Sequence, residues 1–478
     1  MLNKETLKNI FWSFAQQFSN QIIGFAITIV LARLLDPFDF GLMGMIYFIV
    51  TIGNVLIDSG FSYSLIRTKE ADEKDYSTIF YTNILLGICF TLFSIAIAPL
   101  VADFYEQPSL VYIIRVFSVT FIITAFSSVQ QTYLIKTLKF KTLAIISLVS
   151  SVFGGVIGFI LASNKFGVWS IVWTSISSVG VTALLLWFCS SWKPRKFFDV
   201  RLLKKHFNFG YKLTLTNMSD AVFRNAYNIV IGKIYDPNIV GYYSRADSLK
   251  KIAVFTVISA TNKVTYPLLS SIQDDEIEFR KNYVTIIRVV SFVVTPFLLL
   301  LCVFAEPIIL ILLTDKWAQV IPYFQIVCLS GLLYPMSSFN VNALSVKGRS
   351  DLVLKLEIIN KAILILLISM ALNYSIFVLL ASVIIFSISE YVIDIFASQK
   401  VINYSLKNQL KDYLPILIIS LICSALCWQL DALLKEFELS NWIRLGFGSL
   451  CFGLLYLASC YLLKIKSYWM VKSLFAKK

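Results

Sequence analysis

The chain has 478 residues, of which 58% are hydrophobic and 15% are charged. A mean hydropathy of +0.77 excludes a water-soluble globular domain, because no compact fold of this length hides that much apolar surface from water. The formal net charge of +14 indicates attraction to anionic lipid, and no nucleic-acid partner is expected.

Apolar runs long enough to cross a membrane recur along the chain. About 20 helical residues cross a hydrocarbon core of roughly 30 Å. Fourteen such runs predict an all-α integral membrane protein with about 14 transmembrane helices. The first run is too long for a cleaved signal peptide, so we expect it to remain as the first helix. The expected spans cover residues 10–32, 42–65, 80–101, 111–133, 143–162, 168–190, 209–232, 242–265, 284–304, 321–343, 355–372, 375–398, 413–431 and 443–463.

One decapeptide occurs twice, 200 residues apart. ARLLDPFDFG at 32–41 matches GKIYDPNIVG at 232–241 in its basic residue, its Asp-Pro pair and its final Gly. A second pair, FSSVQ at 126–130 and MSSFN at 336–340, follows in the same order at an offset of 210. Two ordered matches indicate a tandem duplication. We interpret the Asp-Pro turns as structural, because Pro and Gly at turn positions need no ligand to explain them.

The duplication predicts two six-helix lobes related by the repeat, with two extra helices after them. Expected spans 209–232 and 242–265 are the most polar, and their correspondence to the first two spans is what identifies them as helices. The predicted regions are an N-terminal lobe at 1–190, a basic cytoplasmic linker at 191–208, a C-terminal lobe at 209–398, and two extra helices with a basic cytoplasmic tail at 399–478.

Basic residues predict the orientation of the chain in the membrane. The connections on one side of the predicted bundle hold 31 Lys and Arg residues, and those on the other side hold 7. Because basic loops stay on the cytoplasmic side, both termini are predicted to be cytoplasmic.

Two expected spans carry a polar face at membrane depth. In the first span, Gln17, Asn20 and Gln21 recur at helical spacing. Such faces must look inward, since a centrally placed charge costs about 2.5–3.5 kcal/mol in lipid. We therefore expect both faces to line a substrate cavity. The residues of span 209–232 on the equivalent face are Asn217, Asp220, Arg224 and Asn228.

The second copy of the repeat also adds positive charge. Arg224, Arg245 and Lys250, together with Asn228, are predicted to bind an anionic substrate, because the planar guanidinium fork suits phosphate oxygens. The alternative is that acidic residues four positions earlier neutralise these cations within each helix. We favour that alternative for Lys251 and leave it open for Arg224 and Arg245. The charged residues of this region are Arg224, Arg245, Lys250, Lys251, Asp220 and Asp247, with a net charge of +2.

One carboxylate of the first lobe is a candidate for ion coupling. Asp58 lies one helical turn after Asn54, and a carboxylate beside an amide can hold Na⁺ or exchange a proton. A hydrogen bond between packed helices is the alternative explanation. Glu390 and Asp394, also four residues apart, are interpreted as a surface pair near the cytoplasmic end of their span.

Enzyme chemistry is not expected. The sequence contains no P-loop, and its single histidine, His206, lies between basic residues in a connection. All eight cysteines lie inside or at the edges of apolar spans, so no disulfide framework, metal or other cofactor is predicted. Cys423 and Cys427 share a helix face and are interpreted as a packed pair.

The order of these features resembles the polysaccharide transporter family, the Wzx-type flippases of the multidrug/oligosaccharidyl-lipid/polysaccharide exporter superfamily. The likeness covers nearly the whole chain. The segments that carry it are ARLLDPFDFG at 32–41, FGVWSIV at 166–172, SWKPRKF at 191–197, RNAYNIVIGKIYDPNIVGYYSRADSLKK at 224–251 and YPLLSSIQDD at 266–275.

The resemblance implies a transporter that moves a polyprenyl-pyrophosphate-linked oligosaccharide across the bacterial cytoplasmic membrane by alternating access, for surface polysaccharide assembly. It implies membrane lipids and other polysaccharide assembly proteins as partners, and Na⁺ or H⁺ as the coupling ion. Two other functions stay open. A multidrug or organic-cation antiporter of the same superfamily predicts an acidic cavity, and a membrane-embedded polymerase or ligase predicts acid/base pairs on outer loops.

Overall fold

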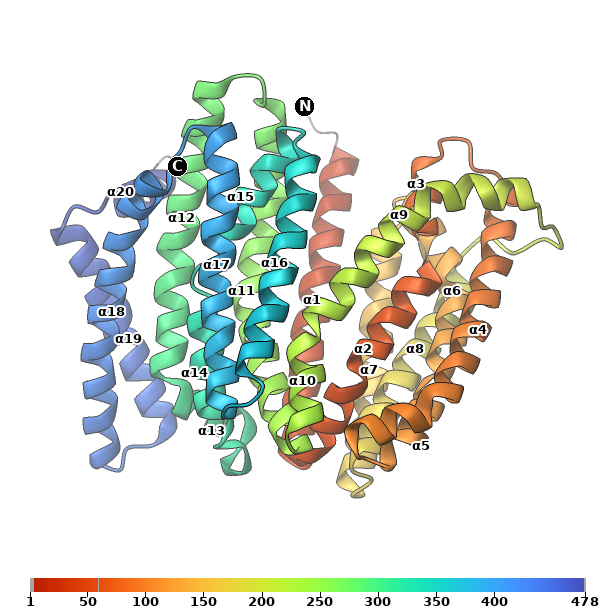
Figure 1. Ribbon diagram of the computed structural model, residues 1–478, viewed down its shortest axis with the longest axis horizontal. Coiled ribbons are helices and arrows are strands. Elements are labelled where there is room, and N and C mark those ends of the chain that lie inside the picture. The colour runs from red at the N-terminus through yellow and green to blue at the C-terminus, as the bar shows by residue number, and fades with distance from the viewer. Residues whose placement is uncertain (1–3, 59, 477–478) are drawn as a thin grey trace. The chain divides into compact units, whose positions relative to one another are not determined.

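The computed structural model describes residues 4–58 and 60–476, and all regular elements in that part of the chain are helices (Figure 1). They form two compact units, which we call unit 1, Met1–Ser244, and unit 2, Arg245–Lys478. An all-helical fold suits a chain in lipid, because a helix satisfies its own backbone hydrogen bonds. The predicted fold class is confirmed at this level.

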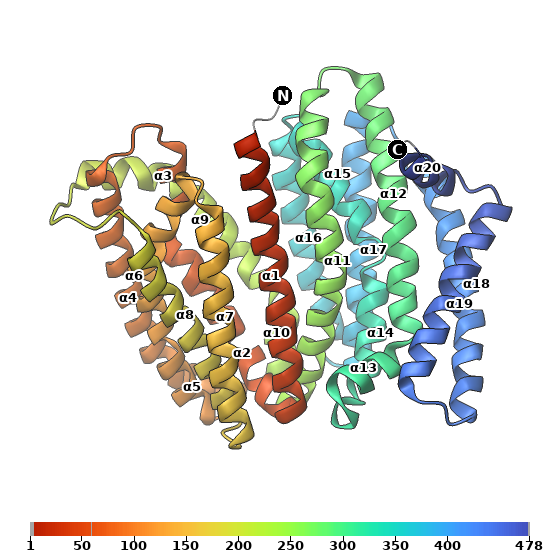
Figure 2. The same cartoon turned by 180° about the vertical axis from the view of Figure 1, so that it is seen from behind.

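Unit 1 is built around the long helices at the start of the chain. Helix α7 lies beside α1 and α8, as both ribbon views show (Figures 1 and 2). Helix α9 packs on α2, α3 and α4. The helices of unit 1 are α1 (Lys4–Leu34), α2 (Pro37–Asp58), α3 (Phe61–Arg67), α4 (Glu73–Tyr105), α5 (Ser109–Phe117), α6 (Val119–Lys136), α7 (Phe140–Ser163), α8 (Val168–Cys189), α9 (Val200–Arg224), α10 (Ala226–Ile234) and the start of α11 (Pro237–Ser271).

Unit 2 contains the rest of α11 and the helices that follow it. Helix α12 packs on α14, α15 and α18, and α17 packs on α14, α15 and α16. The helices of unit 2 after α11 are α12 (Glu276–Val303), α13 (Ala305–Leu313), η1 (Asp315–Trp317), α14 (Val320–Ser330), α15 (Tyr334–Val346), α16 (Ser350–Ala371), α17 (Ile376–Ile402), α18 (Leu406–Glu436), α19 (Asn441–Leu462) and α20 (Lys466–Ala476).

Each of the fourteen expected spans coincides with one helix or with two consecutive helices. In the described part of the chain, ten helical segments are long and apolar enough to cross a membrane. The other four expected spans, at 10–32, 209–232, 242–265 and 355–372, lie on helices that this criterion does not include. The total of fourteen spans and the two-lobe layout therefore stay predictions.

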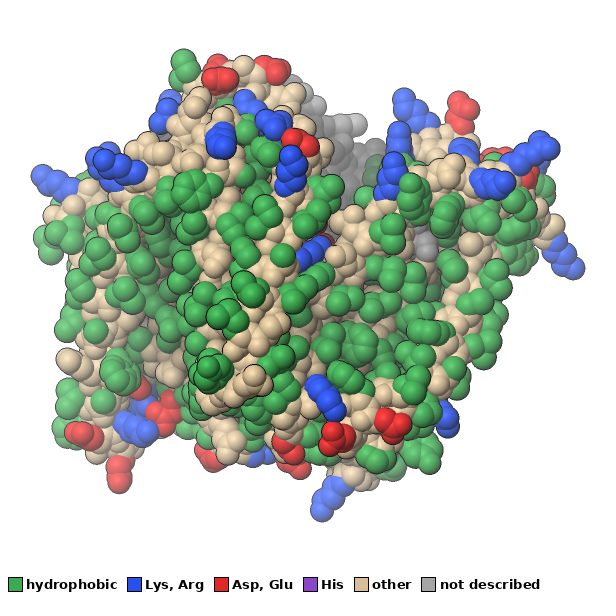
Figure 3. Space-filling model, in the orientation of Figure 1, with side chains coloured by type: hydrophobic (Ala, Val, Ile, Leu, Met, Phe, Trp, Pro, Cys, Tyr) green, Lys and Arg blue, Asp and Glu red, His purple; other side chains and the backbone are tan. Residues whose placement is uncertain are grey.

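The surface has the character of a membrane protein. Figure 3 shows hydrophobic side chains over the flanks of each unit, with Lys, Arg, Asp and Glu mostly at the ends of the helices. Many large apolar side chains are exposed, among them Leu100 at 69% and Phe188 at 84%. Such exposure is stable in contact with lipid tails and would be unfavourable in water.

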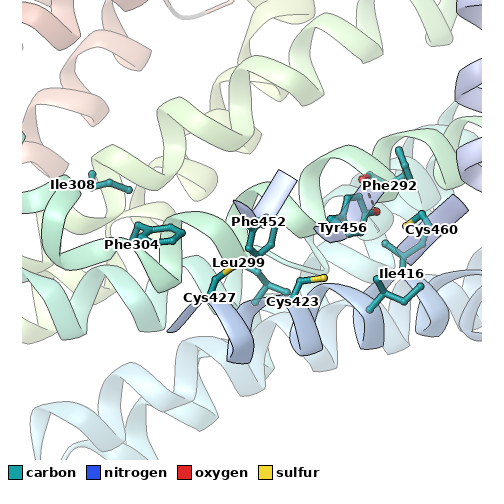
Figure 4. Packing of buried hydrophobic residues seen from close by; sticks show 11 residues of the cluster. Phe292, Leu299, Phe304, Ile308, Ile416, Cys423, Cys427, Phe452, Tyr456 and Cys460 are labelled. Atoms are coloured by element: carbon teal, nitrogen blue, oxygen red, sulfur yellow. Dashed lines mark hydrogen bonds between the residues drawn. The ribbon is translucent and has the colours of Figure 1, made fainter. Parts of the chain in front are cut away.

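The core of unit 2 ties the last two long helices to α12 and α13. Phe292 and Leu299 of α12 and Phe304 meet apolar residues of α18 and α19 (Figure 4). Cys423 and Cys427 are buried free thiols in this cluster, which confirms the predicted packed pair. The Tyr456 hydroxyl donates to the backbone oxygen of Phe292 at 3.0 Å.

The two copies of the repeated decapeptide have the same local structure. Pro37 and Pro237 are the first residues of α2 and α11, a position where the missing N–H leaves no helix hydrogen bond unmade. The Asp236 carboxylate accepts from the backbone N–H of Asn238 at 2.7 Å, and that of Asp39 accepts from the N–H of Asp36 at 3.3 Å. These contacts account for the turns without a ligand.

The two copies also contact each other within unit 1. A Cβ atom on Gly41 would lie 1.8 Å from the backbone oxygen of Pro237, and one on Gly241 would lie 2.1 Å from that of Pro37. This reciprocal contact is the pattern of a local two-fold axis. The backbones of α2 and α11 approach so closely that only glycine fits at either position.

We predict that Gly41→Ala destabilises the protein by about 1–3 kcal/mol, the usual cost of an extra methyl group in a closed contact. Gly180→Ala is the control, since its Cβ meets nothing within 4 Å and alanine favours the interior of α8. Thermal unfolding in detergent measures both. A Gly41→Ala protein as stable as the Gly180→Ala protein would contradict the close contact.

Candidate functional site

The predicted substrate residues lie in both units. Unit 1 contains Gln17, Asn20 and Gln21 on α1, with Arg224 and Asn228 near the junction of α9 and α10. Gln17 and Gln21 are half-buried, whereas the side chain of Asn20 lies outside the described residues. Their role in binding stays a prediction.

Arg224 is placed by a break in the predicted span 209–232. Helix α9 ends at Arg224 and α10 begins at Ala226. Between them, the buried Asn225 side chain donates to the backbone oxygen of Ala221 at 2.7 Å, which satisfies a carbonyl at the end of α9. Broken helices at membrane depth are common features of transporter sites, because they free backbone groups to face a cavity.

The charge of Arg224 is not neutralised within its own helix. Its side chain is exposed, and no ion pair joins it to Asp220 or to any other carboxylate of the described chain. Asp220 has polar contacts of its own. The guanidinium group therefore has its donors available for an anion.

Unlike Arg224, the two lysines of unit 2 have an acidic partner, because the Asp247 carboxylate makes ion pairs with both Lys250 and Lys251. Asp247 accepts from Lys250 Nζ at 3.1 Å and from Lys251 Nζ at 2.6 Å. The expected pairing of Lys251 is thus confirmed, and Lys250 shares the same partner. Arg245 is half-buried one turn earlier on α11. Lys250 and Arg245 remain candidate ligands, although part of the positive charge near Lys250 is already balanced.

The coupling candidate Asp58 lies at the end of α2. Its carboxylate accepts hydrogen bonds from the Ser62 hydroxyl and backbone N–H. The Ser62 hydroxyl also contacts the Thr132 hydroxyl of α6 at 2.8 Å. Asp58 is thus linked to a neighbouring helix, as the packing alternative requires, while Asn54 is exposed one turn earlier.

The interpretation of Asp394 as part of a surface pair is wrong. Asp394 is 1% exposed, accepts from the Ser337 hydroxyl, and accepts from Asn360 Nδ2 at 3.3 Å. Nearby, Asn340 Oδ1 accepts from Ser398 at 2.7 Å and from Gln409 at 3.1 Å. The spacing from Glu390 suggested a surface pair, but the true partners come from α15 and α16.

His206 is also more important to the fold than its basic surroundings indicated. It is 0% exposed, its Nδ1 lies 2.8 Å from the Ser64 hydroxyl, and its Nε2 lies 2.8 Å from Asp75 Oδ1. Because this Ser–His–Asp chain is closed to substrate, we interpret it as a clamp between α9, α3 and α4 and not as a catalytic triad.

A buried arginine that the sequence analysis did not single out joins the C-terminal helices to α13. Arg444 is 3% exposed and holds Asp431 through two hydrogen bonds of 3.0 and 2.7 Å. Its Nη2 also lies 3.0 Å from Glu306 Oε2. Burial raises the pKa of Glu306, but hydrogen bonds from Lys435 and Arg444 outweigh that effect and lower it.

Two units of helices, many of them long and apolar enough to cross a membrane, define the class of polytopic membrane proteins. The fold matches that of lipid II flippase MurJ in its inward closed conformation with a TM-score of 0.74, at 18% identity, over 95% of this chain and 99% of that chain. The likeness shows the fold.

Residues 30–322 match the family of polysaccharide biosynthesis proteins, and the chain belongs to that family. The lipopolysaccharide biosynthesis protein WzxC of Escherichia coli (strain K12) is 24% identical over 363 residues, which are 75% of this chain and 73% of that protein. The succinoglycan biosynthesis transport protein ExoT of Rhizobium meliloti (strain 1021) is 23% identical over 337 residues, or 70% and 68% of the two chains. The resemblance to Wzx-type transporters is confirmed.

We predict that Arg444→Leu destabilises the protein by about 3–5 kcal/mol, because it leaves the buried Asp431 carboxylate without its counter-ion. Lys435→Gln is the matched control, since it removes an exposed partner of the same Glu306 and costs about 0–1 kcal/mol. Thermal unfolding of the purified protein distinguishes them. The double variant Arg444→Leu/Asp431→Leu should regain much of the loss, and a double variant as unstable as the single one would refute the ion-pair explanation.

Proposed function

We propose that the protein is a flippase that carries polyprenyl-pyrophosphate-linked oligosaccharide units across the bacterial cytoplasmic membrane by alternating access. The observation that carries the proposal is Arg224, an exposed cation at the break between α9 and α10 that makes no ion pair with the residues the structure describes. It occurs in a chain of the polysaccharide biosynthesis family, whose relative ExoT is named as a transport protein, and the chain shares its fold with MurJ, which is named as a flippase.

The chemistry of the proposed substrate suits these residues. A pyrophosphate carries negative charge on several oxygens, and the planar guanidinium of Arg224 can donate two parallel hydrogen bonds to them. Arg245 and Lys250 of unit 2 would add positive charge. Gln17, Asn20, Gln21 and Asn228 offer amide donors and acceptors for sugar hydroxyls.

The proposed function also has consequences for the location, the orientation and the partners of the protein. The many apolar helices support a location in a membrane, and the excess of basic connections on one side supports the proposal that both termini are cytoplasmic. We propose membrane lipids, the lipid-linked oligosaccharide and other polysaccharide assembly proteins as its partners. An organic-cation antiporter would need acidic groups where Arg224 and Arg245 lie, and an outer-face polymerase would need acid/base pairs on loops that are short here.

We predict that Arg224→Ala lowers translocation about 10- to 100-fold, because a hydrogen bond to a charged group contributes about 1.5–3 kcal/mol. A strain that lacks the protein is complemented at matched expression, and the leaflet in which lipid-linked oligosaccharide accumulates is measured. Arg201→Ala is the control, since Arg201 is an exposed arginine in the first turn of the same helix.

The flippase proposal requires accumulation in the inner leaflet without the protein, relief by wild type and Arg201→Ala, and little relief by Arg224→Ala. If the lipid-linked units reach the outer leaflet without the protein and merely fail to be lengthened or attached, an outer-face enzyme replaces the flippase.

We also propose that Asp58, with Asn54, couples transport to Na⁺ or H⁺. In proteoliposomes, Asp58→Asn should remove the acceleration by an ion gradient while leaving downhill flipping, because the amide cannot carry the charge of a carboxylate. Asp394→Asn serves as a comparison, because Asp394 is a buried carboxylate of unit 2 that accepts from a hydroxyl and from a side-chain amide. Coupling retained by Asp58→Asn and lost by Asp394→Asn would move the ion site to unit 2.

A further inference from the structure

Unit 2 contains a basic cavity at one end of its long helices. Its volume is about 740 Å³, within the range of small-molecule sites. It lies between the N-terminal end of α12, the C-terminal end of α17, the N-terminal end of α18 and the short helix α20. These parts are far apart in the sequence, so only the folded unit creates the cavity.

The lining of the cavity is strongly cationic. Six basic and two acidic side chains give a net charge of +4. Arg280, Lys281, Lys411 and Lys466 make no ion pair within the described chain. The charged lining residues are Arg280, Lys281, Arg288, Lys347, Lys411, Lys466, Glu276 and Asp412.

The carboxylates of the cavity do not cancel this charge. Asp412 is already engaged, because Arg288 Nη2 donates to both of its oxygens at 2.8 Å and the Tyr404 hydroxyl donates to Oδ2. Glu276 is exposed at the first residue of α12. Arg288 also lines the cavity, and its buried Nε has no hydrogen-bond partner in the described chain.

The start of α12 does not itself account for the site. Asp275 caps that helix by accepting from the backbone N–H groups of Ile277 and Glu278 at 3.0 and 2.9 Å. The positive field therefore comes from side chains of four different segments and not from free backbone donors.

The position of the cavity indicates a lipid ligand. Helices α12, α17 and α18 are long and apolar enough to span a membrane, and the cavity lies at their ends. Helix α20 carries Trp469, which is 42% exposed and meets Tyr468 edge to face with the ring centroids 5.6 Å apart. Tyr468 in turn contacts Phe292 of α12. A short helix with Lys and exposed Trp is typical of the membrane interface.

We propose that this cavity binds the phosphate headgroup of an anionic phospholipid from the cytoplasmic leaflet. In this proposal Arg280, Lys281 and Lys411 surround the phosphate, and Arg288 adds its buried Nε as a hydrogen-bond donor. Basic pockets between membrane helices on the cytoplasmic side bind anionic headgroups in this way. None of the proposed substrate residues lines this cavity, and its occupation does not depend on whether the protein is a flippase.

The test compares two double variants of the full chain in detergent, each of which removes two positive charges. Arg280→Gln/Lys411→Gln changes cavity residues that make no ion pair with the described chain. Lys400→Gln/Lys407→Gln changes exposed lysines on α17 and α18 that do not line the cavity. Binding of short-chain phosphatidylglycerol, phosphatidylcholine and inorganic pyrophosphate is measured, with thermal unfolding to confirm that both variants fold.

We expect wild type to bind phosphatidylglycerol in preference to phosphatidylcholine. The cavity variant should bind it about tenfold more weakly and the control variant within about twofold of wild type. Equal weakening in both variants would mean general attraction to a basic surface and would overturn the site. Saturable binding of pyrophosphate without binding of phosphatidylglycerol would overturn the lipid assignment.

Discussion

The structure depends on one constraint: polar groups inside a membrane protein must find partners within the protein, because lipid offers none. Buried ion pairs and hydrogen bonds in both units provide such partners. Asp394 lies with Ser337 and Asn360, and Arg444 holds Asp431. Each cluster joins separate helices, so polar contacts give specific positions to helices whose apolar faces could pack in many ways.

This constraint makes cations without partners informative. Within the described chain, Arg224 has no acidic partner, and the cavity of unit 2 keeps an excess of basic side chains although Asp412 pairs with Arg288, whereas Arg444 is balanced by Asp431 and Glu306. This excess of positive charge is the reason we propose an anionic ligand for each of the two sites. The two sites also differ in setting. Arg224 lies within a predicted span, at the depth expected for a transported substrate, and the cavity lies at the helix ends where headgroups are found.

The repeated decapeptide shows how a local motif acquires a tertiary role. Its Asp, Pro and Gly explain a turn followed by a helix, and the sequence analysis interpreted it in that way. Folding brings the two copies together, so that Gly41 and Gly241 each contact the backbone of the other copy. The glycines are thus required by a contact between segments 200 residues apart, which no single copy of the motif reveals.

The sequence alone determined that the chain lies in lipid, that its fold is helical and which family it resembles. Hydropathy, the length of the apolar runs and the order of the motifs are local properties of the chain, so they can be read without the tertiary structure. The sequence also indicated Arg224 as a candidate substrate ligand and predicted the ion pair of Lys251 with Asp247, since both follow from helical spacing. Only the tertiary structure decided that His206 and Asp394 are buried and that distant basic loops meet at one cavity. Those features depend on side chains from separate helices, whose packing is set by the whole fold.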